Sequence, residues 1–230
     1  MRTPCQPPLI NSNSNPMRYS IVLPGLVAAT LAFSNLHANE EVTLVKSNFD
    51  DGANPPTGWI TDYEWTGNSY YVQNKMQVTT GNDGGKGGVV HLRPDAEYQK
   101  GSPMPGEGGA KMETIPFVLE PGFRYKCTLD VKGGPSRVYF AGYRWAPGVR
   151  PNDQPTLQDL RMIYKSKVAN TPASPEWTSV SLEFPGVALS PEALKHLQQV
   201  RFMTLFVWFM KDGSVDNIVV TKTPDPSVQF

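Results

Sequence analysis

The chain has 230 residues, with 21 basic and 21 acidic side chains and three histidines, so its formal net charge at pH 7 is zero. A chain without a basic field does not attract nucleic acid, so we expect no nucleic-acid partner. The sequence contains only two cysteines. This number excludes a disulfide framework, and neither cysteine has the spacing of a zinc site.

Residues 1–38 have the layout of a secretory signal. Met17-Arg18 opens a short positive region, residues 21–33 form an apolar run, and Ala38 ends the segment before two glutamates. The run is shorter than the roughly 20 residues that span a bilayer, so we expect no transmembrane segment in the mature chain and a secreted, periplasmic or extracellular location. Met17 is an alternative start, and an uncleaved amphipathic anchor is the alternative to cleavage. Cleavage leaves a single domain over residues 39–230.

Short extended runs alternate with Gly, Pro, Asn and Asp clusters along the rest of the chain, which is typical of all-β proteins. One short helix is expected after Ser190, which can cap it, and residues 156–164 are ambiguous between a helical turn and a strand. The predicted fold is an all-β, two-sheet antiparallel jelly-roll β-sandwich with one short helix. An immunoglobulin-like sandwich is the alternative, but the chain lacks its Cys…Trp…Cys spacing. Strands are expected over residues 42–49, 70–79, 89–93, 111–119, 123–131, 137–145, 177–184 and 200–210, and in a last strand through Val220.

The run of residues 200–210 is apolar on both faces of the expected strand, whereas a strand buried on one side would alternate. The run therefore lies in the middle of stacked sheets, or one of its faces is an apolar platform. Cys127 is one of the alternate residues of the strand 123–131 that are expected to face the core. We therefore expect it to be a small buried hydrophobic residue. Trp59, Trp177 and Trp208 are assigned to the core.

Four motifs follow one another along the mature chain, at residues 47–59, 119–125, 177–180 and 213–218. The first motif is an Asn-Phe-Asp sequence at the end of the first expected strand, followed by Gly-Trp. The second is a Pro-Gly turn before aromatic residues. The third is a Trp-Thr-x-Val strand, and the fourth is a closing Asp-Asn-Ile strand. Together they resemble the carbohydrate-binding modules of the galactose-binding-like jelly-roll superfamily. The pattern departs at residues 146–170, which form a longer insert.

This resemblance implies a structural Ca²⁺ where the first and last strands lie side by side. Asp50 and Asp216 would supply carboxylates, and backbone carbonyls near Asn48 would complete the oxygen cage. Two carboxylates brought close together repel each other without a cation. Alternatively, Asp50 caps a turn and Asp216 bonds backbone amides.

Sugar recognition is the second chemistry that the residues favour, because flat aromatic rings cover the C–H faces of pyranoses. Along residues 137–145, Val138 and Phe140 would face the core. Tyr139, Tyr143 and Trp145 would share the opposite, solvent-facing side with Arg137. The predicted ligand-binding residues are Trp65, Tyr71, Tyr139, Tyr143, Arg144 and Trp145.

The favoured function is a secreted, non-catalytic protein that binds a polysaccharide or other glycan through exposed aromatic residues. One alternative is a structural or protein-interaction sandwich of the cell envelope that binds another protein and no sugar. A second alternative is a polysaccharide-active enzyme, which needs two carboxylates near each other. No Gly-x-Ser-x-Gly elbow is present, and nothing in the sequence pairs the available acids, Asp62, Glu64, Asp95, Glu97 and Glu183.

Overall fold

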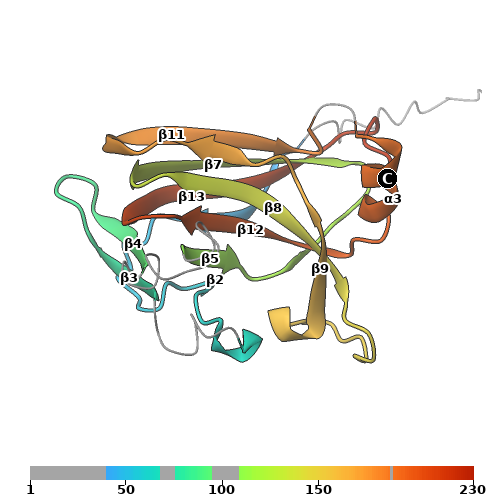
Figure 1. Cartoon of the computed structure of the whole chain (residues 1–230). Coiled ribbons are helices and arrows are strands. Elements are labelled where there is room, and N and C mark those ends of the chain that lie inside the picture. The colour runs from blue at the N-terminus through green and yellow to red at the C-terminus, as the bar shows by residue number, and fades with distance from the viewer. Residues whose placement is uncertain (1–39, 68–75, 95–108, 187–188) are drawn as a thin grey trace, which may run out of the picture. The chain divides into compact units, whose positions relative to one another are not determined.

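The computed structural model describes residues 40–67, 76–94, 109–186 and 189–230, and shows two antiparallel sheets and one α-helix (Figure 1). The expected signal at residues 1–38 and the candidate Tyr71 lie outside the described residues. Within the described ranges, no helix is both long and apolar enough to cross a membrane.

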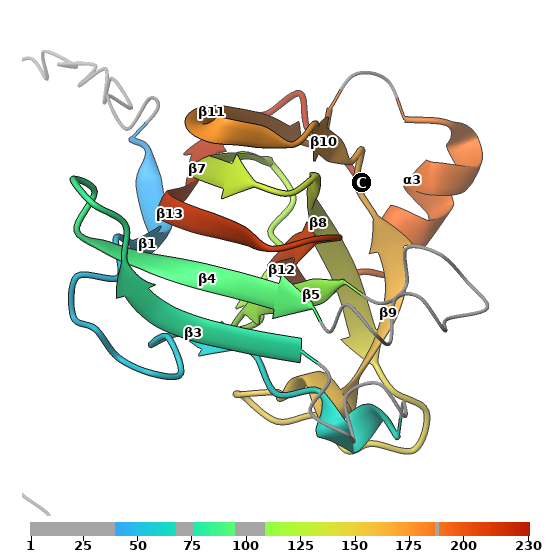
Figure 2. The ribbon, with the colours of Figure 1, turned by 60° about the vertical axis from the view of Figure 1, so that its left-hand side comes forward.

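The first sheet has the strand order β11-β7-β13-β4-β3, and β1 pairs with β13 beside this path. It joins the first and last of the described strands, as the family resemblance implied (Figure 2). Its strands are β1 (Val42–Ser47), β3 (Met76–Asn82), β4 (Gly88–Pro94), β7 (Phe123–Gly133), β11 (Ser174–Phe184) and β13 (Gly213–Pro224).

The second sheet has the order β10-β8-β12-β5-β2, with β6 paired to β12 and β9 paired to β8. Along the described strands the chain changes sheet at β1–β2, β2–β3, β4–β5, β6–β7, β7–β8, β10–β11, β11–β12 and β12–β13. This repeated crossing is typical of a jelly roll. Its strands are β2 (Trp59–Ile60), β5 (Ala110–Thr114), β6 (Phe117–Val118), β8 (Ser136–Trp145), β9 (Leu160–Lys165), β10 (Ala169–Thr171) and β12 (Phe202–Phe209).

Three short helical elements complete the described chain: η1 (Glu64–Thr66), η2 (Leu157–Asp159) and α3 (Pro191–Leu197). The helix α3 begins where it was predicted, because Ser190 Oγ accepts a hydrogen bond from the Ala193 amide at 3.1 Å. The ambiguous residues 156–164 hold both candidate structures, the turn η2 followed by the strand β9. The expected strand over residues 111–119 is interrupted at Pro116, which has no N–H to donate to a strand ladder.

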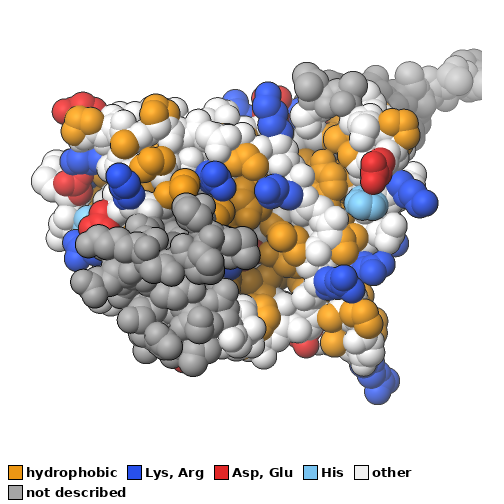
Figure 3. Space-filling view, in the orientation of Figure 1, with side chains coloured by type: hydrophobic (Ala, Val, Ile, Leu, Met, Phe, Trp, Pro, Cys, Tyr) orange, Lys and Arg blue, Asp and Glu red, His pale blue; other side chains and the backbone are white. Residues whose placement is uncertain are grey.

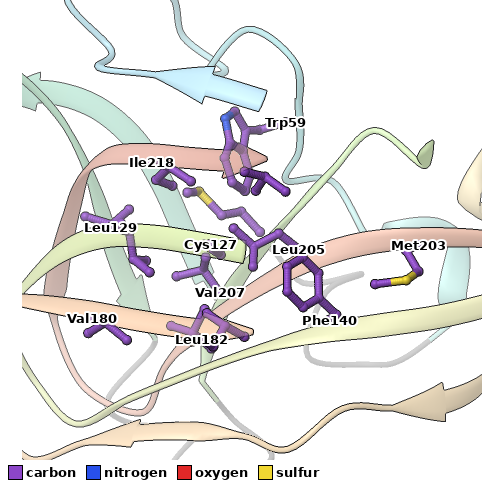
Figure 4. Packing of buried hydrophobic residues seen from close by; sticks show 14 of the residues in the cluster. Trp59, Cys127, Leu129, Phe140, Val180, Leu182, Met203, Leu205, Val207 and Ile218 are labelled. Atoms are coloured by element: carbon purple, nitrogen blue, oxygen red, sulfur yellow. The ribbon is translucent and has the colours of Figure 1, made fainter. Parts of the chain in front are cut away.

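The core lies between the two sheets and is built by the alternate residues of the central strands (Figure 4). In β12 these residues are Met203, Leu205, Val207 and Phe209, and in β7 they include Leu129 and Cys127. Cys127 is buried, as predicted, and this burial raises the pKa of its thiol. The inner faces of the two sheets therefore pack together, and the outer face of the second sheet is left for other contacts.

Candidate functional site

The outer face of the second sheet carries a second hydrophobic cluster, separate from the core. Phe206 on β12 lies between Tyr139 on β8 and Glu113 on β5, each directly opposite it in the strand register. The rings of Tyr139 and Phe206 stack at a centroid distance of 4.6 Å. Strand β12 is thus apolar on both faces because one face packs in the core and the other carries this aromatic cluster.

A cavity of about 280 Å³ opens on this face. The helical turn η1 and the segment from η2 to β9 form its walls, and β5, β8 and β12 form its floor. The turns η1 and η2 lie at the same end of the sheet in both ribbon views (Figures 1 and 2). We call this cavity the outer-face pocket; it is lined by Tyr63, Trp65, Thr66, Lys111, Glu113, Tyr139, Tyr143, Leu157, Leu160, Met162 and Phe206.

Glu113 lies at the bottom of the outer-face pocket and is only 3% exposed. Its carboxylate accepts hydrogen bonds from the Tyr143 hydroxyl at 2.5 Å, the Thr204 hydroxyl at 2.8 Å and the Tyr63 hydroxyl at 3.3 Å. Burial raises the pKa of Glu113 above the ordinary glutamate value, although these three hydrogen bonds oppose the shift. Burial and the neighbouring Glu113 also raise the pKa of Tyr143. Glu113 is therefore a fixed polar group that holds two tyrosine rings in place.

Cationic side chains stand over the aromatic rings of this face. Lys111 Nζ is 4.1 Å from the ring centroid of Tyr63 and 5.4 Å from that of Phe206. Burial lowers the pKa of Lys111, and the charge of Glu113 opposes this shift. The space-filling view shows an apolar hollow bordered by Lys and Arg side chains (Figure 3).

Three of the predicted ligand-binding residues meet in the outer-face pocket: Trp65, Tyr139 and Tyr143. Trp65 is 43% exposed on the rim. Tyr139 and Tyr143 are each only 7% exposed, so the expectation that both are solvent-facing is wrong. They point away from the core, as their alternation predicted, but the hydroxyl of Tyr143 reaches inward to Glu113 and the ring of Tyr139 lies against Phe206.

The other two described candidates do not line the pocket. Trp145 packs edge-on against Phe202, with ring centroids 5.3 Å apart. Arg144 follows Tyr143 in the strand, so its side chain points to the opposite face of the sheet. It donates a hydrogen bond to the side chain of Gln199 at 3.0 Å. The side chains of neighbouring residues in β8 therefore point to different faces of the sheet.

Of the three tryptophans assigned to the core, only Trp59 lies there. Trp177 projects from the outer face of the first sheet, donates a hydrogen bond to Asp83 at 3.0 Å and lies beneath Lys86. Trp208 projects from the outer face of the second sheet, beneath Arg137. The assignment of Trp177 and Trp208 to the core is therefore wrong, because each occupies a strand position whose side chain points away from the core.

Sequence reasoning missed most of the pocket. Lys111 and Glu113 alternate with the buried Met112 in β5, and this alternation was the available signal. The insert at residues 146–170, recognised only as a departure from the family pattern, supplies one wall. The missed lining residues are Tyr63, Thr66, Lys111, Glu113, Leu157, Leu160, Met162 and Phe206.

The expected calcium ligands lie where β1 ends beside β13. Asn48 donates a hydrogen bond to Asp50 at 2.6 Å, and the other Asp50 oxygen accepts the Gly88 amide at 2.8 Å. Asp216 is 2% exposed and accepts the Asn217 amide at 2.6 Å. Burial raises the pKa of Asp216, and the charges of Asp130 and Asp50 add to this effect.

A lysine occupies this group of carboxylates. The Lys86 ammonium is 2.5 Å from Asp130 and 3.9 Å from Asp216. Calcium takes about six to eight oxygen ligands, and among the described residues no three His, Cys, Asp or Glu side chains are placed to hold a metal ion. An ion here would also meet the charge of Lys86. In the described residues the Lys86 ammonium thus supplies positive charge beside these carboxylates, and the calcium site stays a prediction.

No protein-family model matches the sequence, and no curated protein matches it. Solved structures do match. One is the family 11 carbohydrate-binding module from Clostridium thermocellum in complex with a β-1,3-1,4-mixed-linked tetrasaccharide, at 14% identity and a TM-score of 0.42, covering 82% of this chain and 96% of that chain.

Two further matches are to longer proteins. The CBM22-1–GH10 modules of endo-1,4-β-D-xylanase 10B from Clostridium thermocellum match at 12% identity and a TM-score of 0.41, over 78% of this chain. The enzymatically active domain of bacteriophage CBA120 tailspike protein 4 matches at 14% identity and a TM-score of 0.40, over 71%. The present chain spans only 28% and 19% of their lengths.

Proposed function

We propose that this chain is an exported, non-catalytic protein that binds a glycan in the outer-face pocket. One observation carries the proposal: the pocket combines aromatic rings with a hydrogen-bonded carboxyl group and an ammonium group. Rings cover the C–H faces of a sugar, and a few fixed polar groups orient its hydroxyls.

The size of the outer-face pocket limits what it can hold. Its volume of about 280 Å³ is just below the range of small-molecule sites, which span about 300–1,000 Å³. This space suits one sugar ring or the end of a chain better than a long segment. Because Tyr139 and Phe206 are largely covered, Trp65 on the rim is the ring available for stacking. We expect modest affinity, since one stacking ring must offset the desolvation of several hydroxyls.

The chemistry of the lining supports binding rather than hydrolysis. Glycosidases use two carboxyl groups about 5–10 Å apart, and Glu113 is the only carboxyl group among the described residues that line the pocket. Its oxygens already accept hydrogen bonds from Tyr143, Thr204 and Tyr63. The raised pKa of Tyr143 also keeps its phenol protonated, so the group does not supply a phenolate base.

Gel retardation on a panel of neutral and acidic polysaccharides tests the proposal. At least one polymer should slow the folded protein, and Trp65→Ala should weaken that binding at least tenfold. Trp177→Ala removes a tryptophan from the opposite sheet and should leave binding unchanged, which makes it the matched control. Both variants need a measured melting temperature to show that they are folded. No retardation of the folded wild type by any polymer would count against the proposal.

A further inference from the structure

Three cationic side chains stand over aromatic rings in and beside the outer-face pocket. Besides Lys111, two cations stand over rings of the same aromatic cluster: Lys165 Nζ is 5.4 Å from the Tyr139 centroid, and Arg137 is 5.1 Å from that of Trp208. Tyr139 lines the pocket itself, and Trp208 packs edge-on against the pocket residue Phe206. The three cations therefore border one continuous aromatic surface.

Strand register explains why these cations gather. Lys165 on β9 lies opposite Ala141, two positions along β8 from Tyr139. Arg137 lies opposite Trp208 on β12, and Trp208 lies opposite Lys111 on β5. Because residues at these positions share one face of a sheet, the charges come from three strands but point to the same side.

No carboxylate of a described residue forms an ion pair with Arg137 or Lys165. Two acids beside the pocket walls accept hydrogen bonds from their own segments. Asp159 accepts hydrogen bonds from the amide and hydroxyl of Thr156, both at 2.9 Å, and Asp62 accepts the Glu64 amide at 2.9 Å. Glu113, at the bottom, is shielded by hydroxyl donors. Arg137 and Lys165 thus keep hydrogen-bond donors available for a ligand.

Cation–π contact leaves those donors usable. A guanidinium group stacked on an indole presents its N–H edge outward, in the fork geometry that matches a carboxylate or sulfate. An ammonium group over a ring likewise keeps N–H groups on its far side. A neutral sugar would offer no anionic acceptor to the N–H groups of Arg137 and Lys165, whereas the carboxylate or sulfate of an acidic sugar would accept charge-assisted hydrogen bonds from them.

We propose that the outer-face pocket and the aromatic surface beside it select acidic glycans, with Arg137 and Lys165 binding carboxylate or sulfate groups of a chain that has a sugar ring stacked on Trp65. This inference rests on the proposed glycan binding and adds the class of ligand. Arg137 and Lys165 set specificity, and Trp65 provides affinity for any sugar that fits.

Matched pairs of polymers separate the two proposals. Polygalacturonate, alginate and hyaluronan are each compared with their carboxyl-reduced forms, and a sulfated galactan with its desulfated form, by affinity electrophoresis of the wild type. We expect at least one acidic polymer to bind roughly tenfold more tightly than its neutral partner, the size of one charge-assisted contact. The binding pair then identifies the anion as carboxylate or sulfate. Raising NaCl from 50 to 500 mM should weaken only the acidic interaction.

Variants test the assigned cations on the polymer that binds. Lys165→Gln and Arg137→Gln should each reduce binding of the acidic form about three- to tenfold and leave binding of its neutral partner unchanged. Lys195→Gln, which removes a lysine from helix α3, is the charge-matched control and should change neither. Trp65→Ala should weaken both forms equally. If Arg137 and Lys165 serve only to cover rings, their loss will lower the melting temperature without changing the selectivity.

The possible failures are distinct. Equal binding of acidic and neutral partners would overturn the anionic selectivity and leave glycan binding intact. Tighter binding of the neutral forms would do the same. No binding of any polymer by the folded protein would overturn both proposals.

Discussion

Glu113 offers the sharpest test of how the outer-face pocket is held together. Replacing it by leucine preserves most of its volume but removes the acceptor for the hydroxyls of Tyr143 and Thr204. Tyr63 also contacts the Ile60 carbonyl at 3.3 Å and keeps that partner. Two buried hydroxyls therefore lose their acceptor in Glu113→Leu.

A buried polar group that loses its hydrogen-bond partner costs about 1–3 kcal/mol. Two such hydroxyls give an expected loss of about 3 kcal/mol in the free energy of unfolding, or roughly 6–12 °C in melting temperature for a domain of this size. Glu113→Gln retains one carbonyl acceptor, and rotatable hydroxyls can accept from its amide. It should cost about 1 kcal/mol or less near neutral pH.

The pH dependence separates the carboxyl group from its amide analogue. Burial raises the pKa of Glu113 in the folded state above the ordinary glutamate value of 4.5. Its protonated form is thus favoured by folding, and that contribution is complete below the unfolded pKa and is lost as pH rises towards the folded pKa. The wild type should therefore lose stability relative to Glu113→Gln as pH increases above about 4.5.

Urea unfolding followed by tryptophan fluorescence, at pH values from 5 to 8, measures both effects. A Glu113→Leu variant as stable as the wild type, with an unchanged denaturant slope, would refute the argument that the hydroxyl contacts matter. A constant stability difference between wild type and Glu113→Gln over this range would refute the raised pKa.

Two further predictions concern the first sheet and the core. Lys86→Met leaves Asp130 and Asp216 without their cation and should cost about 2 kcal/mol, since the Lys86–Asp130 pair is only partly buried; added Ca²⁺ should restore part of the melting temperature. A chelator should leave the wild-type melting temperature unchanged, and a drop that calcium reverses would instead support the expected calcium site. Cys127 should react with a thiol reagent only after unfolding, because it is buried and its pKa is raised; rapid labelling of the native protein would contradict its place in the core.

Local alternation made much of the sandwich predictable. In residues 123–131 and 137–145, inward and outward side chains alternate with the period of a strand, so the burial of Cys127 and Phe140 could be deduced without knowing the neighbouring strands. The cap at Ser190 and the break at Pro116 are also local effects. Each depends on one side chain and the backbone beside it.

The outer-face pocket could not be deduced in this way, because its parts are far apart in the chain. Glu113 receives hydroxyls from residues 30 and 91 positions away, and no local pattern distinguishes it from a solvated glutamate. Strand β12 is apolar on both faces, so its own sequence gives no indication of which face meets the core. Pairing with β5 and β8 decides that question.

The amino-acid sequence alone therefore determines the all-β fold class, the position at which helix α3 begins and the residues of the central strands that face the core. Each of these follows from interactions between residues that are close in the sequence. Only the tertiary structure brings Glu113, Tyr143 and Trp65 to one pocket and inserts Lys86 among the carboxylates expected to hold calcium. The reason is physical: burial and charge pairing depend on the register between strands, and register is a property of the whole sheet.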